Sequence, residues 1–231
     1  MKLIIMALAV GLAAADGAHA ERLTAARVFA DPGLSGPTAR GVKLSPDGQS
    51  VSWIRPRPED ARITDLWIAD VSGGEPRKLI DAALLIDPGR DISEEEKTRR
   101  ERQGVQTSGV IDYQWDEQGR FILAPVEGDL FLFDRGTERL KRLTDTPSGE
   151  IDAKVSAKGG YVSFVRNDNL VIMPSAGGAE RPLTTDGTEL QSWATAEFIA
   201  QEEMGRSTGY WWSPDESRIA LTRVDQTGVD I

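Results

Sequence analysis

The chain has 231 residues and a formal net charge of −10, with a single histidine and no cysteine. An acidic chain of this kind disfavours nucleic acids and anionic lipids as partners. The only histidine is His19, so residues 21–231 hold neither a Ser-His-Asp triad nor a histidine-based zinc site, and we expect no metal or cofactor.

Residues 1–20, MKLIIMALAVGLAAADGAHA, have the pattern of a secretory signal peptide. Lys2 gives a positive start, residues 3–15 are nearly all apolar, and Ala18-His19-Ala20 fits a small-x-small cleavage site. The apolar run is too short to span a membrane. We therefore expect cleavage after Ala20 and export of residues 21–231 to the periplasm or the medium, with no membrane association after the signal is removed.

Four stretches share one pattern, in which apolar residues precede a Ser-Pro-Asp-Gly type of turn and an alternating strand follows it. Proline presets φ in such a turn, aspartate bonds the nearby backbone, and glycine takes positive φ, so each stretch predicts a hairpin. The stretches are VKLSPDGQSVSWI (42–54), YQWDEQGRFILAP (113–125), AKVSAKGGYVSFV (153–165) and YWWSPDESRIALT (210–222).

The first three hairpins are each followed by a second pair of short strands, at 65–80, 129–144 and 169–184. Four strands per repeated unit is typical of β-propeller blades. The sequence therefore predicts an all-β fold with about three and a half four-stranded blades of a propeller. The turn glycines Gly119 and Gly159 are 40 residues apart, whereas the other two intervals are longer. The excess predicts insertions near 82–108 and 186–209.

The first insertion contains DISEEEKTRRERQG, residues 91–104, which predicts a helix. Ser93 and Glu96 form a capping-box pattern, and Gly104 can end the helix. A solvated surface helix rich in ion pairs explains this segment without any function. The alternative is that an arginine reaches into a pocket and binds carboxylate or carbonyl oxygens, for which its rigid fork of donors is suited. The candidates are Arg99, Arg100 and Arg102.

The second insertion contains EFIAQEEMGR, residues 197–206, with adjacent carboxylates at Glu202 and Glu203. On a helical turn the two side chains diverge by about 100° and can flank a small cation. An ammonium group has three donors and no acceptor, so a peptide N-terminus would suit the pair. The simpler explanation is an exposed polar patch, and calcium is weakly supported because no further oxygen ligands cluster there.

The run from Ala196 to Asp225, AEFIAQEEMGRSTGYWWSPDESRIALTRVD, resembles the double-glutamate segment of the dipeptidyl peptidase IV family of serine peptidases, especially its bacterial members. EEEKTRRERQG resembles the arginine-bearing segment of the same family. The resemblance implies that residues 21–231 are part of an eight-bladed propeller that precedes a C-terminal α/β-hydrolase domain. The triad serine, aspartate and histidine would then lie beyond Ile231, and this segment alone would be inactive.

The resemblance also implies roles for particular residues. Glu202 and Glu203 would bind the free N-terminus of a peptide substrate, and Arg100 or Arg102 would hold the carbonyl of its second residue, with Arg100 slightly preferred. The substrates would be peptides cut after an X-Pro or X-Ala dipeptide, and the whole protein would be a homodimer. Which carboxylate makes the shorter bond is open. One of Trp211 and Trp212 should be core.

The competing hypothesis is a non-catalytic periplasmic propeller that serves as a binding scaffold, because its turns would look the same. A third possibility is an inactive relative of the peptidases that has lost its nucleophile.

Overall fold

The computed structural model divides the chain into two units, residues 1–36 and 37–231. The residues it describes are 23–30, 33–34, 36, 38–87, 89, 92, 97, 100–101, 104 and 106–229. The predicted signal peptide lies outside these residues. In the first unit, α1 (Ala25–Val28) begins at Thr24, whose hydroxyl accepts a hydrogen bond from the Arg27 amide at 3.2 Å. Within the described ranges, no helix has the length and apolar character needed to cross a membrane.

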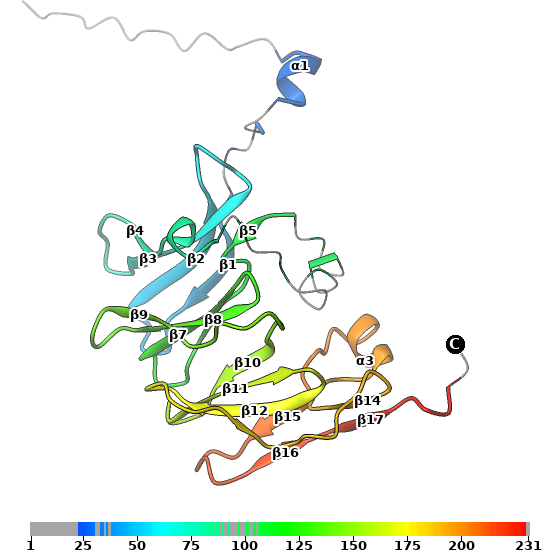
Figure 1. Cartoon of the computed structure of the whole chain (residues 1–231). Coiled ribbons are helices and arrows are strands. Elements are labelled where there is room, and N and C mark those ends of the chain that lie inside the picture. Colours follow the sequence, from blue (N-terminus) through cyan, green and yellow to red (C-terminus); the bar gives the residue numbers. More distant parts are fainter. Residues whose placement is uncertain are drawn as a thin grey trace, which may run out of the picture. The chain divides into compact units, whose positions relative to one another are not determined.

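Three four-stranded antiparallel sheets make up most of the second unit, and each follows the chain order of its strands (Figure 1). This confirms the predicted repetition of four-stranded units. The first sheet also pairs in parallel with β5 (Ser108–Gly109) through β3, a contact that was not predicted. The strands are β1 (Arg40–Leu44), β2 (Ser50–Pro56), β3 (Ile63–Asp70) and β4 (Arg77–Ile80); β6 (Gln114–Trp115), β7 (Phe121–Val126), β8 (Asp129–Asp134) and β9 (Arg139–Arg142); β10 (Ile151–Val155), β11 (Tyr161–Arg166), β12 (Asn169–Pro174) and β13 (Arg181–Pro182).

The fourth repeat begins with a hairpin of β15 (Tyr210–Trp212) and β16 (Ile219–Leu221), so its first strand starts at the predicted residue. The insertion before it contains the helix α3 (Phe198–Glu202), as expected. It also contains β14 (Gln191–Trp193), which pairs with β17 (Arg223–Asp225) and was not predicted. Three residues of mixed polarity carry too little periodicity to reveal such a strand. The first insertion holds the short 3-10 helix η1 (Ala82–Leu84), but most of its predicted helix lies outside the described residues.

The four repeated turns have the predicted geometry. In each, the amide at the fourth position donates to the carbonyl at the first position, at distances of 2.8, 3.1, 2.8 and 2.9 Å along the chain. Positive φ occurs at all four of these positions, which are Gly48, Gly119, Gly159 and Glu216. Glu216 therefore adopts a conformation that disfavours a side chain, and its carboxylate accepts hydrogen bonds from the Lys158 and Gly160 amides of the preceding turn.

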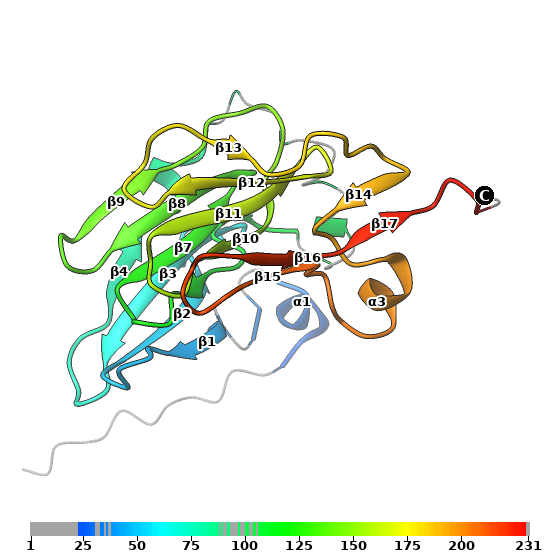
Figure 2. The same ribbon diagram turned by 90° about the horizontal axis from the view of Figure 1, so that it is seen from below.

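The hydrophobic core lies between consecutive sheets, which follow one another in chain order (Figures 1 and 2). Alternate residues of β7 serve two clusters: Ile122 and Ala124 pack toward the first sheet, whereas Phe121 and Leu123 pack toward the third. A strand that is buried on both faces needs apolar residues at nearly every position. This explains the continuous apolar runs of β7 and β8 in the middle sheet.

Candidate functional site

The predicted glutamates lie at the C-terminal end of α3. Glu197 caps the N-terminus, because its carboxylate accepts hydrogen bonds from the Ile199 and Ala200 amides at 2.7 and 3.0 Å. Glu202 is the last helical residue, and Glu203 is the C-cap. Both glutamates, called the Glu pair below, are exposed. The predicted helical turn is therefore confirmed, and the two side chains stand one residue apart on it.

This position is unfavourable for carboxylates on stability grounds. The C-terminal end of a helix presents unsatisfied carbonyl groups and carries partial negative charge, so acidic side chains there repel it and a cation is attracted. The helix is short, which makes the effect small, but its sign is clear. The Glu pair and the helix end together form a surface suited to an ammonium or guanidinium group.

The loop that carries the Glu pair is closed at its base. We define the Glu loop as residues 195–208, whose ends form an isolated antiparallel bridge between Thr195 and Thr208. The Ala196 amide donates to the Ser207 carbonyl at 3.2 Å, and the Gly209 amide donates to the Ala194 carbonyl at 3.1 Å. A Cβ atom on Gly209 would lie 2.5 Å from the Thr222 hydroxyl and even closer to the Thr195 carbonyl. Only glycine fits at this closure point.

Inside the Glu loop, Arg206 links the helix to the base. Its amide donates to the Ala200 carbonyl at 2.9 Å, which closes the C-terminal end of α3, and Gly205 provides the positive φ that this reversal requires. Its guanidinium donates to the Thr208 carbonyl at 2.8 Å. Ala200, a residue of α3, is fully buried. The Glu pair is thus presented on a loop that is tied internally at several points.

A charged pair lies directly behind the base of the Glu loop. Asp152 and Lys154 of β10 form an ion pair at 3.1 Å. The Lys154 ammonium also hydrogen-bonds the Thr208 hydroxyl and, at 3.0 Å, the Tyr210 carbonyl, while it lies 3.8 Å from the centre of the Tyr210 ring. Burial raises the pKa of Asp152 and lowers that of Lys154. Sequence reasoning missed this cluster.

The contacts between the third sheet and the β15–β16 hairpin, called the third junction below, place the tryptophan pair. The Trp212 indole donates to the Ser163 hydroxyl at 2.8 Å, and its ring stacks on Tyr161. The Tyr210 hydroxyl donates to the Asp152 carbonyl at 2.6 Å. Trp211, in contrast, is 46% exposed. The expectation that one tryptophan serves the core is met by Trp212, which is partly buried against the third core cluster.

The contacts between the first and second sheets, called the first junction, repeat this arrangement. The Tyr113 hydroxyl donates to the Gly41 carbonyl at 2.7 Å and bonds the Ser52 hydroxyl at 2.9 Å, and the Trp115 indole donates to Ser52 at 2.9 Å. Lys43 hydrogen-bonds the Tyr113 carbonyl. Burial raises the pKa of Tyr113 to about 12. Ser52 of the alternating β2 strand therefore faces the neighbouring sheet, where its hydroxyl bonds the Tyr113 and Trp115 side chains.

The candidate arginines belong to the first insertion. The Arg100 side chain is 10% exposed and lies 3.3 Å from the Glu127 carboxylate, and its guanidinium donates to the Thr107 carbonyl at 3.5 Å. Glu127 in turn accepts a hydrogen bond from the Gly109 amide at 3.0 Å. These contacts hold Arg100 against the β5 region. Arg99 and Arg102 lie outside the described residues, so the assignment of the carbonyl-binding arginine stays a prediction.

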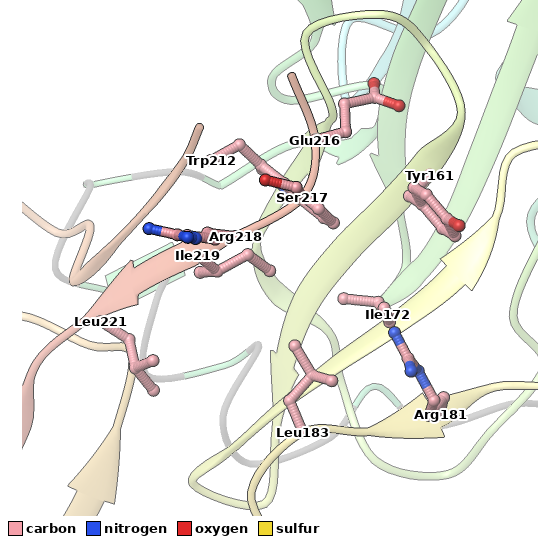
Figure 3. Close-up of a pocket in the computed structure, with 10 residues that line it drawn as sticks. All are labelled: Tyr161, Ile172, Arg181, Leu183, Trp212, Glu216, Ser217, Arg218, Ile219 and Leu221. Carbon is pink, nitrogen blue, oxygen red and sulfur yellow. The ribbon is translucent and has the colours of Figure 1, made fainter. Parts of the chain in front are cut away.

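A shallow cavity of about 220 Å³ lies between strands β11–β13 of the third sheet and the β15–β16 hairpin (Figure 3). Its lining is mixed, with the stacked Tyr161 and Trp212 at one end and Arg181 and Arg218 among the other residues. None of the predicted site residues lines it. In the described part of the chain, no three histidine, cysteine or acidic side chains gather closely enough to hold a metal ion.

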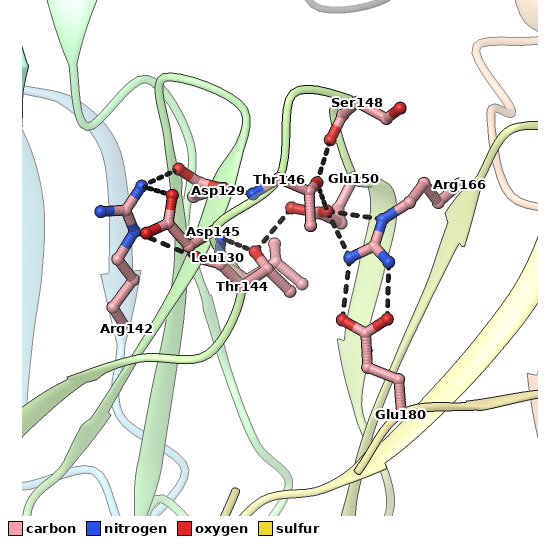
Figure 4. A network of polar contacts seen from close by, with 10 residues as sticks. All are labelled: Asp129, Leu130, Arg142, Thr144, Asp145, Thr146, Ser148, Glu150, Arg166 and Glu180. Atoms are coloured by element: carbon pink, nitrogen blue, oxygen red, sulfur yellow. Dashed lines mark hydrogen bonds and ion pairs between the residues drawn. The ribbon is translucent and has the colours of Figure 1, made fainter. Parts of the chain in front are cut away.

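A second cluster of charged groups connects the second and third sheets (Figure 4). Glu150 is buried, and burial raises its pKa, while Arg166 lies 2.6 Å from its carboxylate and Thr144 donates to it at 2.6 Å. Arg166 also makes two hydrogen bonds to Glu180, at 2.6 and 2.9 Å. Both carboxylates of this network, Glu150 and Glu180, are paired with the one guanidinium of Arg166. These contacts explain the network as a structural link between the second and third sheets, without a ligand.

Comparison with known proteins gives this geometry a context. A family model described as the dipeptidyl peptidase IV (DPP IV) N-terminal region matches residues 110–231, which is more than half of the chain. Dipeptidyl peptidase 8 of Homo sapiens is 28% identical over 139 residues, covering 53% of this chain and 16% of that protein. A probable dipeptidyl peptidase 4 of Aspergillus fumigatus is 31% identical over 103 residues, covering 44% of this chain and 13% of that protein.

A solved structure agrees with the fold. The crystal structure of Porphyromonas gingivalis dipeptidyl peptidase 4 matches with a TM-score of 0.56 and 20% identity, covering 84% of this chain and 26% of that chain. At this identity the match bears on the fold alone. It supports the assignment of the repeated sheets as part of a β-propeller. The chain spans only a small part of the length of each of these relatives.

Proposed function

The chain belongs to the dipeptidyl peptidase IV family as part of its N-terminal region, and from this premise we propose that it is the substrate-selecting propeller segment of an exported serine dipeptidyl aminopeptidase. The whole protein would release X-Pro or X-Ala dipeptides from peptides with a free N-terminus. Its triad would lie in an α/β-hydrolase domain beyond Ile231. The observation that carries the proposal is the exposed Glu pair at the end of α3, on a loop closed at its base.

The chemistry of the Glu pair supports recognition of a cation. The two carboxylates stand on one helical turn, where they can accept hydrogen bonds from the same ammonium group. A peptide α-amino group has a pKa near 8 and is largely charged at neutral pH. The bond from an ammonium to a carboxylate is charge-assisted and therefore stronger than a neutral hydrogen bond.

Anchoring the N-terminus would set which bond is cut. If the ammonium is held at a fixed distance from the nucleophile, only the peptide bond after the second residue reaches it. Binding remote from the reacting bond supplies orientation, which lowers the barrier without new chemistry at the bond itself. An arginine of the first insertion, Arg100 or Arg102, would bind the carbonyl of the second residue and fix the direction of the chain.

Export rests on the signal-like residues 1–20, which precede the described residues. We propose that the mature protein begins at Glu21. N-terminal sequencing of the protein from the periplasm or the medium tests this, and a mature N-terminus that retains Met1 would contradict it.

The Glu pair is tested by kinetics in the whole protein. Replacing Glu202 or Glu203 with glutamine should lower kcat/KM on a free-amine X-Pro chromogenic substrate by about one to three orders of magnitude, because each charge-assisted bond contributes roughly 1.5–3 kcal/mol. Glu189→Gln, an exposed change in the same insertion, is the matched control and should leave the kinetics unchanged. N-acetylation of the substrate should abolish turnover by the unmodified protein.

Two results would contradict the proposal. Kinetics like those of the unmodified protein in both glutamine variants would remove the Glu pair from substrate binding. A complete absence of turnover by the folded whole protein, on any free-amine dipeptide substrate, would instead favour the non-catalytic scaffold or an inactive relative.

A further inference from the structure

We propose that Asp152 and Lys154 are positioning residues for substrate binding, because they hold the base of the Glu loop and so fix where the Glu pair stands. This inference rests on the proposed function of Glu202 and Glu203. Neither residue is expected to touch the substrate. They would act through Thr208, which closes the Glu loop opposite Thr195.

The first support comes from comparing equivalent positions of two repeats. Gly41 lies seven residues before the turn glycine of the first repeat, and Asp152 lies seven residues before that of the third. Both have positive φ, 58° and 48°, and both offer their carbonyl to a tyrosine hydroxyl of the next repeat. Glycine adopts this conformation without strain, whereas aspartate, although it tolerates positive φ better than most residues, does so at a steric cost. The third repeat therefore keeps a side chain where the fold itself favours none.

The second support is what that side chain contacts. The Asp152 carboxylate lies 3.1 Å from the Lys154 ammonium, and that ammonium donates a hydrogen bond to the Thr208 hydroxyl. Arg206 donates to the Thr208 carbonyl and to Ala200 of α3, so the contacts continue from Thr208 to the helix that ends in the Glu pair. A shift of Thr208 would therefore be transmitted to α3.

The third support is burial. Lys154 and Asp152 have side chains that are 24% and 16% exposed, whereas the corresponding Lys43 is 38% exposed and its partner Asp112 is 67% exposed. A pair that is largely removed from water loses much when one member is deleted, because the other charge is left uncompensated. The third junction therefore has a largely buried ion pair, whereas the ion pair of the first junction is more exposed. The largely buried pair is the one that contacts the Glu loop.

The test uses Lys154→Met and its matched control Lys43→Met in the whole protein. Lys43 bonds the Tyr113 carbonyl and faces its ring, as Lys154 does with Tyr210, but among the described residues it makes no hydrogen bond or ion pair to either insertion. Lys154→Met should raise KM for a free-amine X-Pro chromogenic substrate about tenfold with kcat within about threefold, because it weakens binding of the ammonium rather than the chemical step. Lys43→Met should leave KM unchanged. Lys154→Arg should restore most of the lost affinity.

Thermal unfolding is measured on the same variants, so that a loss of stability is recognised as such. If Lys154→Met does not fold, Asp152→Asn replaces it, because asparagine tolerates positive φ and keeps the shape while removing the charge. It should raise KM in the same direction. Equal changes of KM in the Lys154 and Lys43 variants, or no change in either, would overturn the positioning role.

The outcomes separate this inference from the proposed function. If the Glu202 and Glu203 variants raise KM but Lys154→Met behaves like Lys43→Met, only the positioning role fails. If the glutamate variants leave the kinetics unchanged, the proposed function fails, and with it the basis of this inference.

Discussion

The first and third junctions use the same aromatic and serine contacts but differ in what surrounds them. In both, a tyrosine hydroxyl reaches the backbone carbonyl of a positive-φ residue, and a tryptophan indole donates to a serine of the preceding sheet. In the first, the positive-φ residue is Gly41 and the lysine is partly solvated. In the third, it is Asp152, and the lysine is less exposed and bonds the Glu loop. The shared contacts join sheets, and the added ones hold the loop.

The junction between the second and third sheets shows that this pattern is not universal in the chain. There, Gln114 donates from its side chain to the Ala153 carbonyl, at the repeat position that Lys43 and Lys154 occupy in the first and third repeats. The lysine and serine thus come from odd repeats and the tyrosine and tryptophan from even ones. The structural unit of this segment is a pair of sheets rather than a single sheet.

The largest effect that distinguishes the two junctions should come from alanine at a glycine of each, Gly41 in the first and Gly209 at the base of the Glu loop in the third. In Gly209→Ala the new Cβ would clash with the Thr195 carbonyl and Thr222, so we expect a loss of at least about 3 kcal/mol in the free energy of unfolding. In Gly41→Ala the new Cβ meets only Ile54 and Tyr113 at 3.6 and 3.8 Å, and the cost of positive φ is about 1–2 kcal/mol. Denaturant unfolding of the whole protein measures both.

Equal losses for the two glycine variants would show that the closure of the Glu loop is not the tighter of the two sites. A larger loss for Gly41→Ala would reverse the comparison.

A smaller and equal effect is expected from the tyrosines. Tyr113→Phe and Tyr210→Phe each remove a hydroxyl that bonds a backbone carbonyl and a serine, and each should cost about 1–2 kcal/mol. Double-mutant cycles with Ser52→Ala and Ser163→Ala should give similar coupling energies, since the same pair of groups meets in both places. If only one junction showed a coupling energy, the similar geometry of the two tyrosine–serine pairs would not imply a similar contribution to stability.

The smallest effect should come from acid. Hydrogen bonds from Ser45 and Ser213 lower the pKa of Asp47 and of Asp215, respectively, to about 2 from an ordinary 3.8. Because the folded-state pKa is depressed, each carboxylate contributes stability that is present above pH 3.8 and is lost as pH falls toward 2. Both are exposed, so the change in Tm should be small. Asp47→Asn and Asp215→Asn should each reduce the fall in Tm that accompanies a decrease in pH from 3.8 to 2.

Salt should separate the two turns, because Asp47 also lies 3.2 Å from Arg135 of the second sheet. High salt should weaken the contribution of Asp47 more than that of Asp215. An unchanged acid profile in both asparagine variants would assign the acid sensitivity to other carboxylates.

The sequence predicted what depends on local chemistry. The turns, the start of the fourth repeat at Tyr210 and the helical turn under the Glu pair follow from residue preferences over a few positions. Inward-facing Ser52, strand β14 and the Asp152–Lys154–Thr208 cluster could not be predicted, because each depends on a partner far along the chain. Lys154 nevertheless occupies the same position in its repeat as Lys43 does in the first repeat. This recurrence was the one feature of the sequence that could have pointed to the cluster.

The closure of the Glu loop also bears on the order of folding. Each hairpin joins residues that are close in sequence, but the hydrogen bond from Lys154 to Thr208 joins residues 54 apart. Contacts between distant residues form late, since the intervening chain must first lose its freedom. The third sheet and the β15–β16 hairpin must therefore dock before the carboxylates are held in place. Assembly intermediates that lack this docking would have complete hairpins and an unformed Glu loop, so the Glu pair would reach its final position only after the local strand pairs have formed.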